Sequence, residues 1–278
     1  MLHPKLDGAG SIEEVLKFLT GGLRVRSTSE WLIARGWDQN KWKEKKFPTR
    51  EHLDALSTEI PIALIRIDGH AMRCNSKALE VAGITKSTVS PFGGEILKTT
   101  TGEHTGILLD EAMQLIYNAV PVEDEATITN TLRAGLQEFA KHHIGVHDMG
   151  IPAEWWEPYK KLYANEGDSL IHADVFLDMS KASGKKLFLE KIKGGTFNDS
   201  PYPNLKLVGI KIYLDGALGS RGAQLFEEYS DDPENFGISL IEDSEALELM
   251  QIAAANDIVI AIPVAKYIYL HLLICKRR

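Results

Sequence analysis

One lysine stands in an otherwise apolar segment in the C-terminal half of the sequence. Lys211 lies between Ile210 and Ile212, and the segment continues with Tyr213. Alternate residues of a β-strand point to opposite faces, so Lys211 and Tyr213 share the face that the isoleucines do not occupy. Buried lysines are rare unless they are paired or chemically modified. Lys211 is therefore the first candidate for chemistry.

A loop rich in glycine follows this strand. Asp215 and Gly216 end the strand, and small residues then recur at Gly219, Ser220 and Gly222. Residues without bulk let the backbone pass close to other groups. We therefore expect this loop to lie beside whatever group occupies the end of the strand.

Composition limits the classes of protein to which the chain can belong. The sequence has 278 residues, 44% of them apolar, with a net charge of −8 and a pI near 5.6. Such a chain lacks the clustered lysine and arginine of a nucleic-acid-binding protein. Cys74 and Cys275 are far apart and form no CxxC pair, which fits a reduced, cytoplasmic protein better than a disulfide scaffold.

Both ends of the sequence bear on membrane association. Residues 1–4 lack the basic and apolar regions of a signal peptide, so we expect none. Residues 258–275 form a mostly apolar run that resembles a membrane anchor in length. Lys266 near the centre of this run would cost about 2.5 to 3.5 kcal/mol in a bilayer, and Pro263 and His271 weaken it further. We therefore expect no membrane association.

Helices and strands alternate along the C-terminal part of the sequence. The pattern predicts helices at 123–142, 155–164, 182–193 and 244–256, each followed by a strand, at 145–147, 171–177, 205–214 and 258–262. Such alternation is typical of parallel (β/α) units, so we predict an α/β fold, a partial (β/α)8 TIM-type barrel. Chemistry in such barrels lies at the C-terminal ends of strands. The sequence places these residues there: His147, Asp148, Asp178, Lys211 and Asp215.

The N-terminal part departs from this rhythm. Residues 31–121 form an inserted α+β excursion, with strands expected at 31–36 and 60–67, helices at 49–56 and 75–81, and a hairpin between 89 and 103. A helix capped by Ser11 precedes the excursion. We predict one incomplete barrel domain over residues 1–262, which includes the 31–121 excursion, and an aberrant C-terminal tail over 263–278.

Two histidines lie on predicted strands. His172 begins its strand, which favours a structural, hydrogen-bonded role. His147, with Asp148, lies at the predicted end of its strand, where a structural role and a site role both stay open.

Four motifs follow one another along the sequence. They are Arg35-Gly36-Trp37-Asp38, then Arg66 with Asp68-Gly69-His70 and Asn75-Ser76-Lys77-Ala78-Leu79, then Gly145-Val146-His147-Asp148-Met149-Gly150, and finally residues 211–223. In this order and spacing they resemble the motifs of amidohydrolase family 3, in the YtcJ-like subgroup of the metal-dependent hydrolase superfamily. The resemblance extends from residue 31 to about residue 262.

This resemblance gives Lys211 a specific role. In similar enzymes a lysine at this strand end reacts with carbon dioxide, and the carbamate bridges two divalent metal ions, for which zinc is expected here. The metals lower the pKa of a bound water, and the hydroxide attacks an amide carbon. The resemblance thus implies a metal-dependent hydrolase of carbon–nitrogen bonds other than peptide bonds. The residues alone leave open an unmodified Lys211 paired with Asp178 or Asp215.

Other ligands that the family uses are missing from the sequence. The resemblance requires a His-x-His pair at the end of the first barrel strand, and the sequence contains none. Pro263 stands where a second metal-binding histidine is expected. Lys211 alone remains of the usual ligands, and catalytic residues are unknown. We therefore expect an impaired hydrolase, the alternative being a non-catalytic barrel-derived scaffold or interaction protein.

The candidates for substrate contact are Trp37, Arg66, His70, Asp215 and Arg221. The family match favours a pocket role for His70, while a bond from its ring to the following loop is the structural alternative. The tryptophans of the excursion, Trp37 included, also suit packing. The resemblance implies a small, amide-like substrate, and the sequence is compatible with a homo-oligomer.

Overall fold

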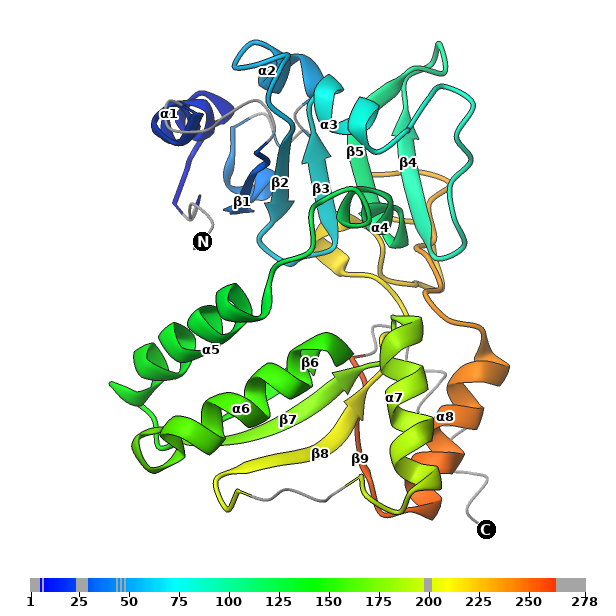
Figure 1. Ribbon diagram of the computed structural model, residues 1–278. Helices are drawn as coiled ribbons and strands as arrows, with labels where there is room; N and C mark the ends of the chain where they lie inside the picture. The colour runs from blue at the N-terminus through cyan, green and yellow to red at the C-terminus, as the bar shows by residue number, and fades with distance from the viewer. Residues whose placement is uncertain are drawn as a thin grey trace. The chain divides into compact units, whose positions relative to one another are not determined.

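The computed structural model describes residues 6, 8–23, 30–43, 45, 47, 49–197 and 202–263 (Figure 1). These residues form two compact units. The parallel-sheet unit contains Val122–Leu214 and the described residues from Ile241 onward, and the mixed-sheet unit contains the described residues up to Pro121 together with Asp215–Leu240. The chain thus passes from one unit to the other between Leu214 and Asp215.

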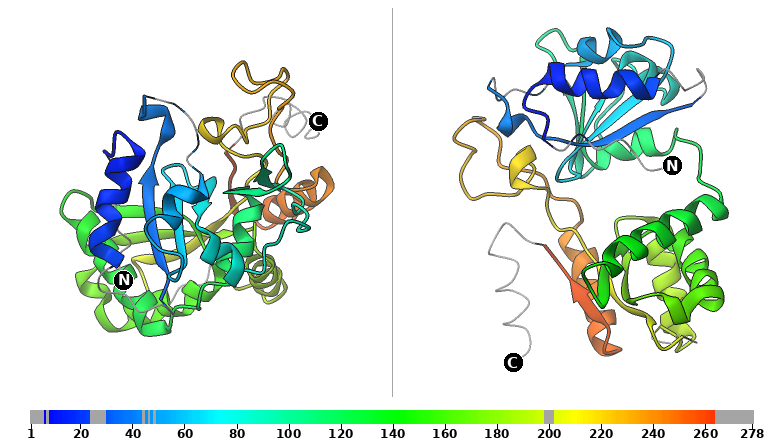
Figure 2. Two further views of the ribbon diagram at one scale, coloured as in Figure 1. Left: turned by 90° about the horizontal axis from the view of Figure 1, so that it is seen from above. Right: turned by 90° about the vertical axis from the view of Figure 1, so that its left-hand side faces the viewer.

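Four parallel strands form the sheet of the parallel-sheet unit, in the order β6-β7-β8-β9. The strands are β6 (Gly145–Ile151), β7 (His172–Asp178), β8 (Leu205–Lys211) and β9 (Val259–Ala261). They alternate with the helices α5 (Glu125–Ala140), α6 (Trp156–Glu166), α7 (Ala182–Lys193) and α8 (Asp243–Ala255), while η3 (Ala153–Trp155) and η4 (Gly167–Ser169) flank α6. Figure 2 shows this unit from two further sides.

The two faces of the parallel sheet differ in burial. One face carries apolar residues that are fully buried, among them Val175, Leu177 and Leu207. The opposite face carries Asp174, Asp178 and Lys211, which are only half-buried. Because Asp178 and Lys211 are register partners, these polar residues of β7 and β8 share one face of the sheet.

Five strands form the sheet of the mixed-sheet unit, in the order β1-β2-β3-β5-β4. The strands are β1 (Leu32–Trp37), β2 (Ile62–Arg66), β3 (Ala71–Cys74), β4 (Gly94–Lys98) and β5 (His104–Asp110). β1 and β2 are parallel, and the other neighbours are antiparallel. The helices of this unit are α1 (Ile12–Leu23), α2 (Arg50–Asp54), α3 (Ser76–Val81) and α4 (Gln114–Tyr117), with the short turns η1 (Gln39–Lys41), η2 (Glu111–Met113) and η5 (Leu218–Ser220).

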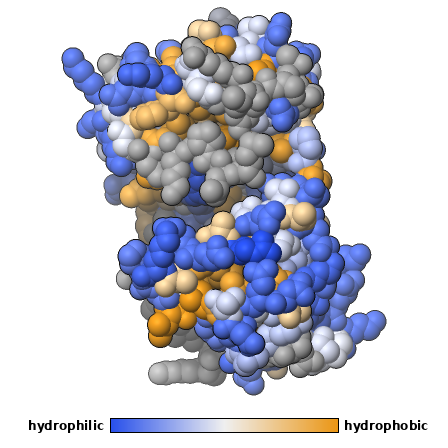
Figure 3. All heavy atoms as spheres, turned by 60° about the vertical axis from the view of Figure 1, so that its left-hand side comes forward, coloured by the Kyte–Doolittle hydropathy of each residue, from blue (hydrophilic) through white to orange (hydrophobic). Residues whose placement is uncertain are grey.

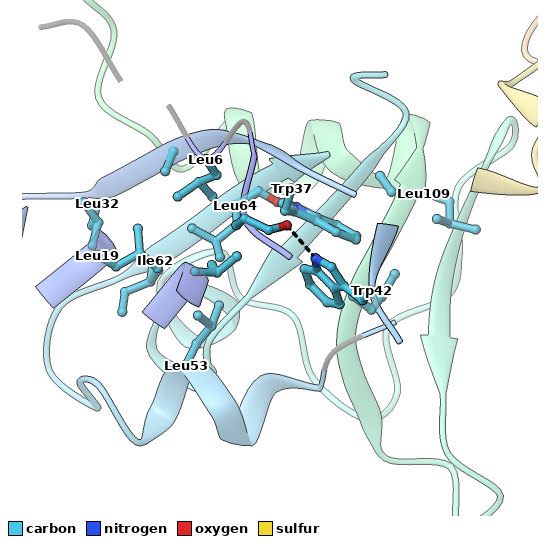
Figure 4. Packing of buried hydrophobic residues seen from close by; sticks show 14 residues of the cluster. Leu6, Leu19, Leu32, Trp37, Trp42, Leu53, Ile62, Leu64 and Leu109 are labelled. Atoms are coloured by element: carbon cyan, nitrogen blue, oxygen red, sulfur yellow. Dashed lines mark hydrogen bonds between the residues drawn. The ribbon is translucent and has the colours of Figure 1, made fainter. Parts of the chain in front are cut away.

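Apolar side chains on the two faces of the mixed sheet form separate clusters. The cluster in Figure 4 joins Leu19 of α1 to Leu32, Ile62 and Leu64 of the sheet. Leu19, Leu32 and Ile62 are fully buried, so this cluster packs the first residues of β1 and β2 against α1.

Most of the expected elements are confirmed. The helix at 182–193 occurs as predicted, and Ser11 caps α1 by accepting a hydrogen bond from the Glu14 N–H at 3.3 Å. The strand that carries Lys211 occurs, but it ends at Lys211 rather than at residue 214. Two further expectations were wrong in extent. β6 continues to Ile151 rather than ending at His147, and the excursion is a five-stranded sheet rather than two strands and a hairpin. An α/β architecture is therefore established, while the full barrel stays a prediction.

The surface in Figure 3 is largely hydrophilic, with apolar side chains between the polar ones. Val122, Phe139 and Ile144 are the apolar residues most exposed around α5, at 93%, 53% and 96%. None of the helices in the described ranges is long and apolar enough to span a membrane. The expected tail lies almost wholly outside the described residues, as does most of the apolar run 258–275.

Candidate functional site

Lys211 ends β8 and lies opposite Asp178 of β7 in the sheet register. Its Nζ lies 5.0 Å from the centre of the Tyr213 ring, and its methylene groups lie beside Gly150, where a Cβ would stand 3.5 Å from Lys211 Cγ. Burial lowers the pKa of the Lys211 amine, and the charge of Asp178 opposes this shift. A lysine with a lowered pKa has more of the neutral amine that reacts with electrophiles.

The described residues do not complete a metal site around Lys211. No group of three or more His, Cys, Asp or Glu side chains in the described ranges is arranged to hold a metal ion. The nearby histidines have other partners. His147 Nε2 lies 3.4 Å from Asp174 Oδ2, and His172 Nε2 lies 2.8 Å from Asp174 Oδ1. The donor set therefore does not fit the metal centre that the family resemblance implies.

His147 and Asp148 lie in the middle of β6, not at its end. Both residues line a cavity of about 490 Å³ beside α5. Tyr159 donates a 2.8 Å hydrogen bond to Asp148 Oδ2, and burial raises the pKa values of both groups. Because a buried tyrosine hydroxyl needs a partner, this contact gives Asp148 a structural role.

In the mixed-sheet unit, Arg66 ends β2 as the centre of a buried polar network. Its Nη2 donates to Asp38 Oδ1 at 2.8 Å, its Nη1 donates to Asp68 Oδ2, and its Nε donates to Gln39 Oε1 at 2.8 Å. Arg66 is 2% exposed. A guanidinium whose donors are engaged in this way holds the loops around it, and contact of Arg66 with a substrate stays a prediction.

The loop after β2 fixes His70 from both sides. The backbone N–H of His70 donates to Asp68 Oδ1 at 3.0 Å, and its carbonyl accepts from the Asp110 N–H at 3.1 Å. Its ring Nδ1 lies 2.6 Å from Asp110 Oδ1. Burial alone would lower the pKa of His70, but the hydrogen bond and charge of Asp110, with smaller contributions from Asp68 and Asp215, raise it instead.

Asp110 was not among the sequence candidates. Its side chain is 1% exposed, and burial raises its pKa against the opposing effect of His70. Its backbone has φ +46° and ψ −121°, a conformation that favours glycine. Asp110 ends the apolar run Ile107–Leu109, where a polar residue normally signals a solvated turn, and its partner His70 is 40 positions away. The available signal was a carboxylate directly after a buried strand.

The remaining candidates lie in the same unit. Asp215 is 5% exposed, and its Oδ2 accepts a 3.0 Å hydrogen bond from the Gln224 N–H. Arg221 donates to both oxygens of Asp231, at 3.2 and 2.6 Å. Trp37 is 1% exposed and donates to the Leu64 carbonyl, which gives it a packing role. Contact of these three residues with a substrate stays a prediction.

The fold defines the class of protein as α/β. In the parallel-sheet unit strands alternate with helices, and Lys211 ends one of these strands. The chain belongs to the amidohydrolase family, whose sequence profile matches residues 2–267.

The chain is similar to several proteins in sequence or fold. YtcJ of Bacillus subtilis, which is named as an amidohydrolase, is 32% identical over 94% of this chain and 49% of its own length. LONG AFTER FAR-RED 3 of Arabidopsis thaliana is 28% identical over 94% of this chain and 46% of its own length. An uncharacterized metal-dependent hydrolase from Pyrococcus horikoshii has a similar fold, with a TM-score of 0.62 at 23% identity over 94% of this chain and 49% of that chain. The chain thus spans about half the length of the curated relatives it matches.

Proposed function

We propose that this chain represents a metal-dependent hydrolase of carbon–nitrogen bonds other than peptide bonds, to which it contributes Lys211 as a metal ligand. The observation that carries the proposal is the position of Lys211, half-buried at the C-terminal end of a parallel strand. Family membership supports it, because the matched region includes Lys211. An N-substituted formamide deformylase of Arthrobacter pascens, 33% identical over 39% of this chain and 20% of its own length, agrees with an amide-like substrate.

Lys211 serves this role in its carboxylated form. The neutral Nζ attacks carbon dioxide, the new N–C bond forms, and the amine loses a proton, which leaves an anionic carbamate. A lowered pKa favours the neutral amine that this reaction needs. Zinc is the metal we expect, although the described donors beside Lys211 do not complete its coordination.

We further propose that the chain alone is impaired as an enzyme. The second candidate function is a non-catalytic scaffold that keeps the fold without the metal, and the absence of a three-donor cluster from the described ranges favours it. Metal analysis of the purified chain, together with its hydrolysis of N-formyl and N-acyl amides before and after chelation, separates the two functions. Retained metal with turnover that chelation abolishes would show an intact hydrolase and contradict the impairment, whereas a folded, metal-free and inactive chain supports the scaffold.

The wider properties of the protein are also proposals. A small amide-like molecule is the proposed substrate, a cytoplasmic location follows from the cysteine content, and a homo-oligomer is compatible with the sequence. The domain proposal is a barrel domain over residues 1–262 that includes the 31–121 excursion.

A further inference from the structure

Several hydrogen bonds fix the His70–Asp110 pair. Two hydrogen bonds connect the residues, one from the Asp110 N–H to the His70 carbonyl and one between the side chains at 2.6 Å. A third bond, from the His70 N–H to Asp68 Oδ1, fixes the same residue from the preceding loop. The His70 ring is therefore held in one orientation.

The two side chains of this pair differ in solvent exposure. The Asp110 side chain is 1% exposed, whereas the His70 side chain is 22% exposed. The carboxylate is thus shielded from water and the imidazole reaches the surface of the unit. A dissolved molecule can therefore contact the imidazole but not the carboxylate, which affects such a molecule only through the ring.

Two features oppose the presence of an aspartate at position 110. The backbone conformation favours glycine, and the Oδ2 atom is buried without a hydrogen-bond partner in the described part of the chain. Glycine at this position would relieve both features. A residue that combines an unfavourable backbone conformation with an unpartnered buried oxygen is a candidate for a functional role.

The glycine loop after β8 completes the environment of the carboxylate. A Cβ placed on Gly216 or on Gly222 would lie 2.6 Å from Asp110 Oδ2. The described neighbour of these two glycines is therefore Asp110, which the sequence did not indicate. The loop covers one side of the carboxylate and excludes water from it, which strengthens its electrostatic effect on His70.

We propose that Asp110 is a positioning residue that keeps the His70 imidazole oriented and cationic, so that the ring binds a carbonyl or carboxylate oxygen of a small ligand. Asp68 and Asp215 are the other charged groups that act on His70, and both reinforce the cationic form. The proposal rests on the proposed function only for the identity of the ligand as a substrate. The pairing itself requires neither metal nor turnover.

The test is an NMR titration of the His70 ring in the whole chain labelled on histidine, with Asp110→Asn and Asp110→Gly as variants. The pKa of His70 lies above its ordinary value of about 6.5 in the natural chain and falls in Asp110→Asn, because the carboxylate that stabilises the cationic ring is gone. Asp110→Gly shows the same fall without loss of resistance to urea. The matched control Asp231→Asn, which removes an exposed carboxylate of the same unit, leaves the titration unchanged.

The ligand is tested with acetate as a minimal carboxylate probe, at a pH between the two pKa values measured for the natural chain and for Asp110→Asn. Acetate shifts the His70 ring signals of the natural chain and does not shift those of the variant. An unchanged pKa in both Asp110 variants overturns the positioning role, and acetate insensitivity of the natural chain overturns the ligand. Neither readout needs metal or turnover, so failure of either test leaves the proposed function standing, and failure of the proposed function leaves both readouts unchanged.

Discussion

The Oδ2 atom of Asp110 occupies space that a Cβ on Gly222 would need, because the two positions lie 2.6 Å apart. Gly222→Ala should therefore destabilise the mixed-sheet unit by about 1 to 3 kcal/mol, the usual cost of overpacking. Urea denaturation measures the change.

The same substitution in an Asp110→Gly background tests the cause. The added methyl then has no carboxylate to displace, so most of the loss should disappear. Gly216→Ala is the matched control, because its Cβ would also stand 2.8 Å from the Gly222 backbone, which Asp110→Gly does not remove. An equal cost of Gly222→Ala in both backgrounds would show that the carboxylate is not the limiting neighbour.

Arg66 neutralises two carboxylates from a buried position. Arg66→Met removes the guanidinium and leaves Asp38 and Asp68 without their shared partner, which should cost about 3 kcal/mol of unfolding free energy. Arg66→Lys should recover part of this loss, because an ammonium keeps the positive charge but lacks the planar set of N–H donors of the guanidinium. Lys86→Ala, which breaks the exposed pair with Glu103, should cost under about 1 kcal/mol.

The His70–Asp110 pair should make stability depend on pH. The folded pKa of His70 is raised, so its contribution is fully present below its unfolded pKa of about 6.5 and is lost as the pH rises through the folded value. Urea midpoints should therefore fall as the pH rises above about 6.5. Asp110→Asn should flatten this fall, and an identical slope in the variant would contradict the assignment.

The pKa of the Lys211 amine should depend on the charge of Asp178. Burial lowers the pKa of the amine and Asp178 opposes the shift, so Asp178→Asn should lower it further. The titration of reductively methylated Lys211, followed by NMR, measures this change. Asparagine keeps an oxygen for the Ser180 N–H, which donates to Asp178 at 2.8 Å, so the local turn should remain. A rise in the pKa would mean that Asp178 does not act on Lys211 through its charge.

Sequence periodicity located the Lys211 strand because its signal is local. An apolar run interrupted by one lysine predicts a strand, and β8 ends at that lysine. The same reasoning missed Asp110, because its importance comes from a register that brings β3 and β5 together across many residues. His70 was identified through its motif, but its partner depends on strand pairing that no local pattern specifies.

The limits of β6 show a second reason for error. Gly150 suggests a loop, since glycine weakens strands, and the expected strand therefore stopped at His147. In the structure Gly150 has φ +132° and lies at a register shift, so the strand passes through it as an irregularity and continues to Ile151. Tertiary pairing with β7 outweighs the local signal.

Metal content of the purified natural chain tests the central claim most directly. The chain is expressed with zinc, passed through gel filtration and analysed by mass spectrometry beside Lys211→Ala and Lys211→Arg. If Lys211 is the only ligand that this chain contributes, all three proteins should carry the same low, substoichiometric level of metal. Retention of about two ions per natural chain, and their loss in both Lys211 variants, would show that the chain holds a complete centre and would contradict the account.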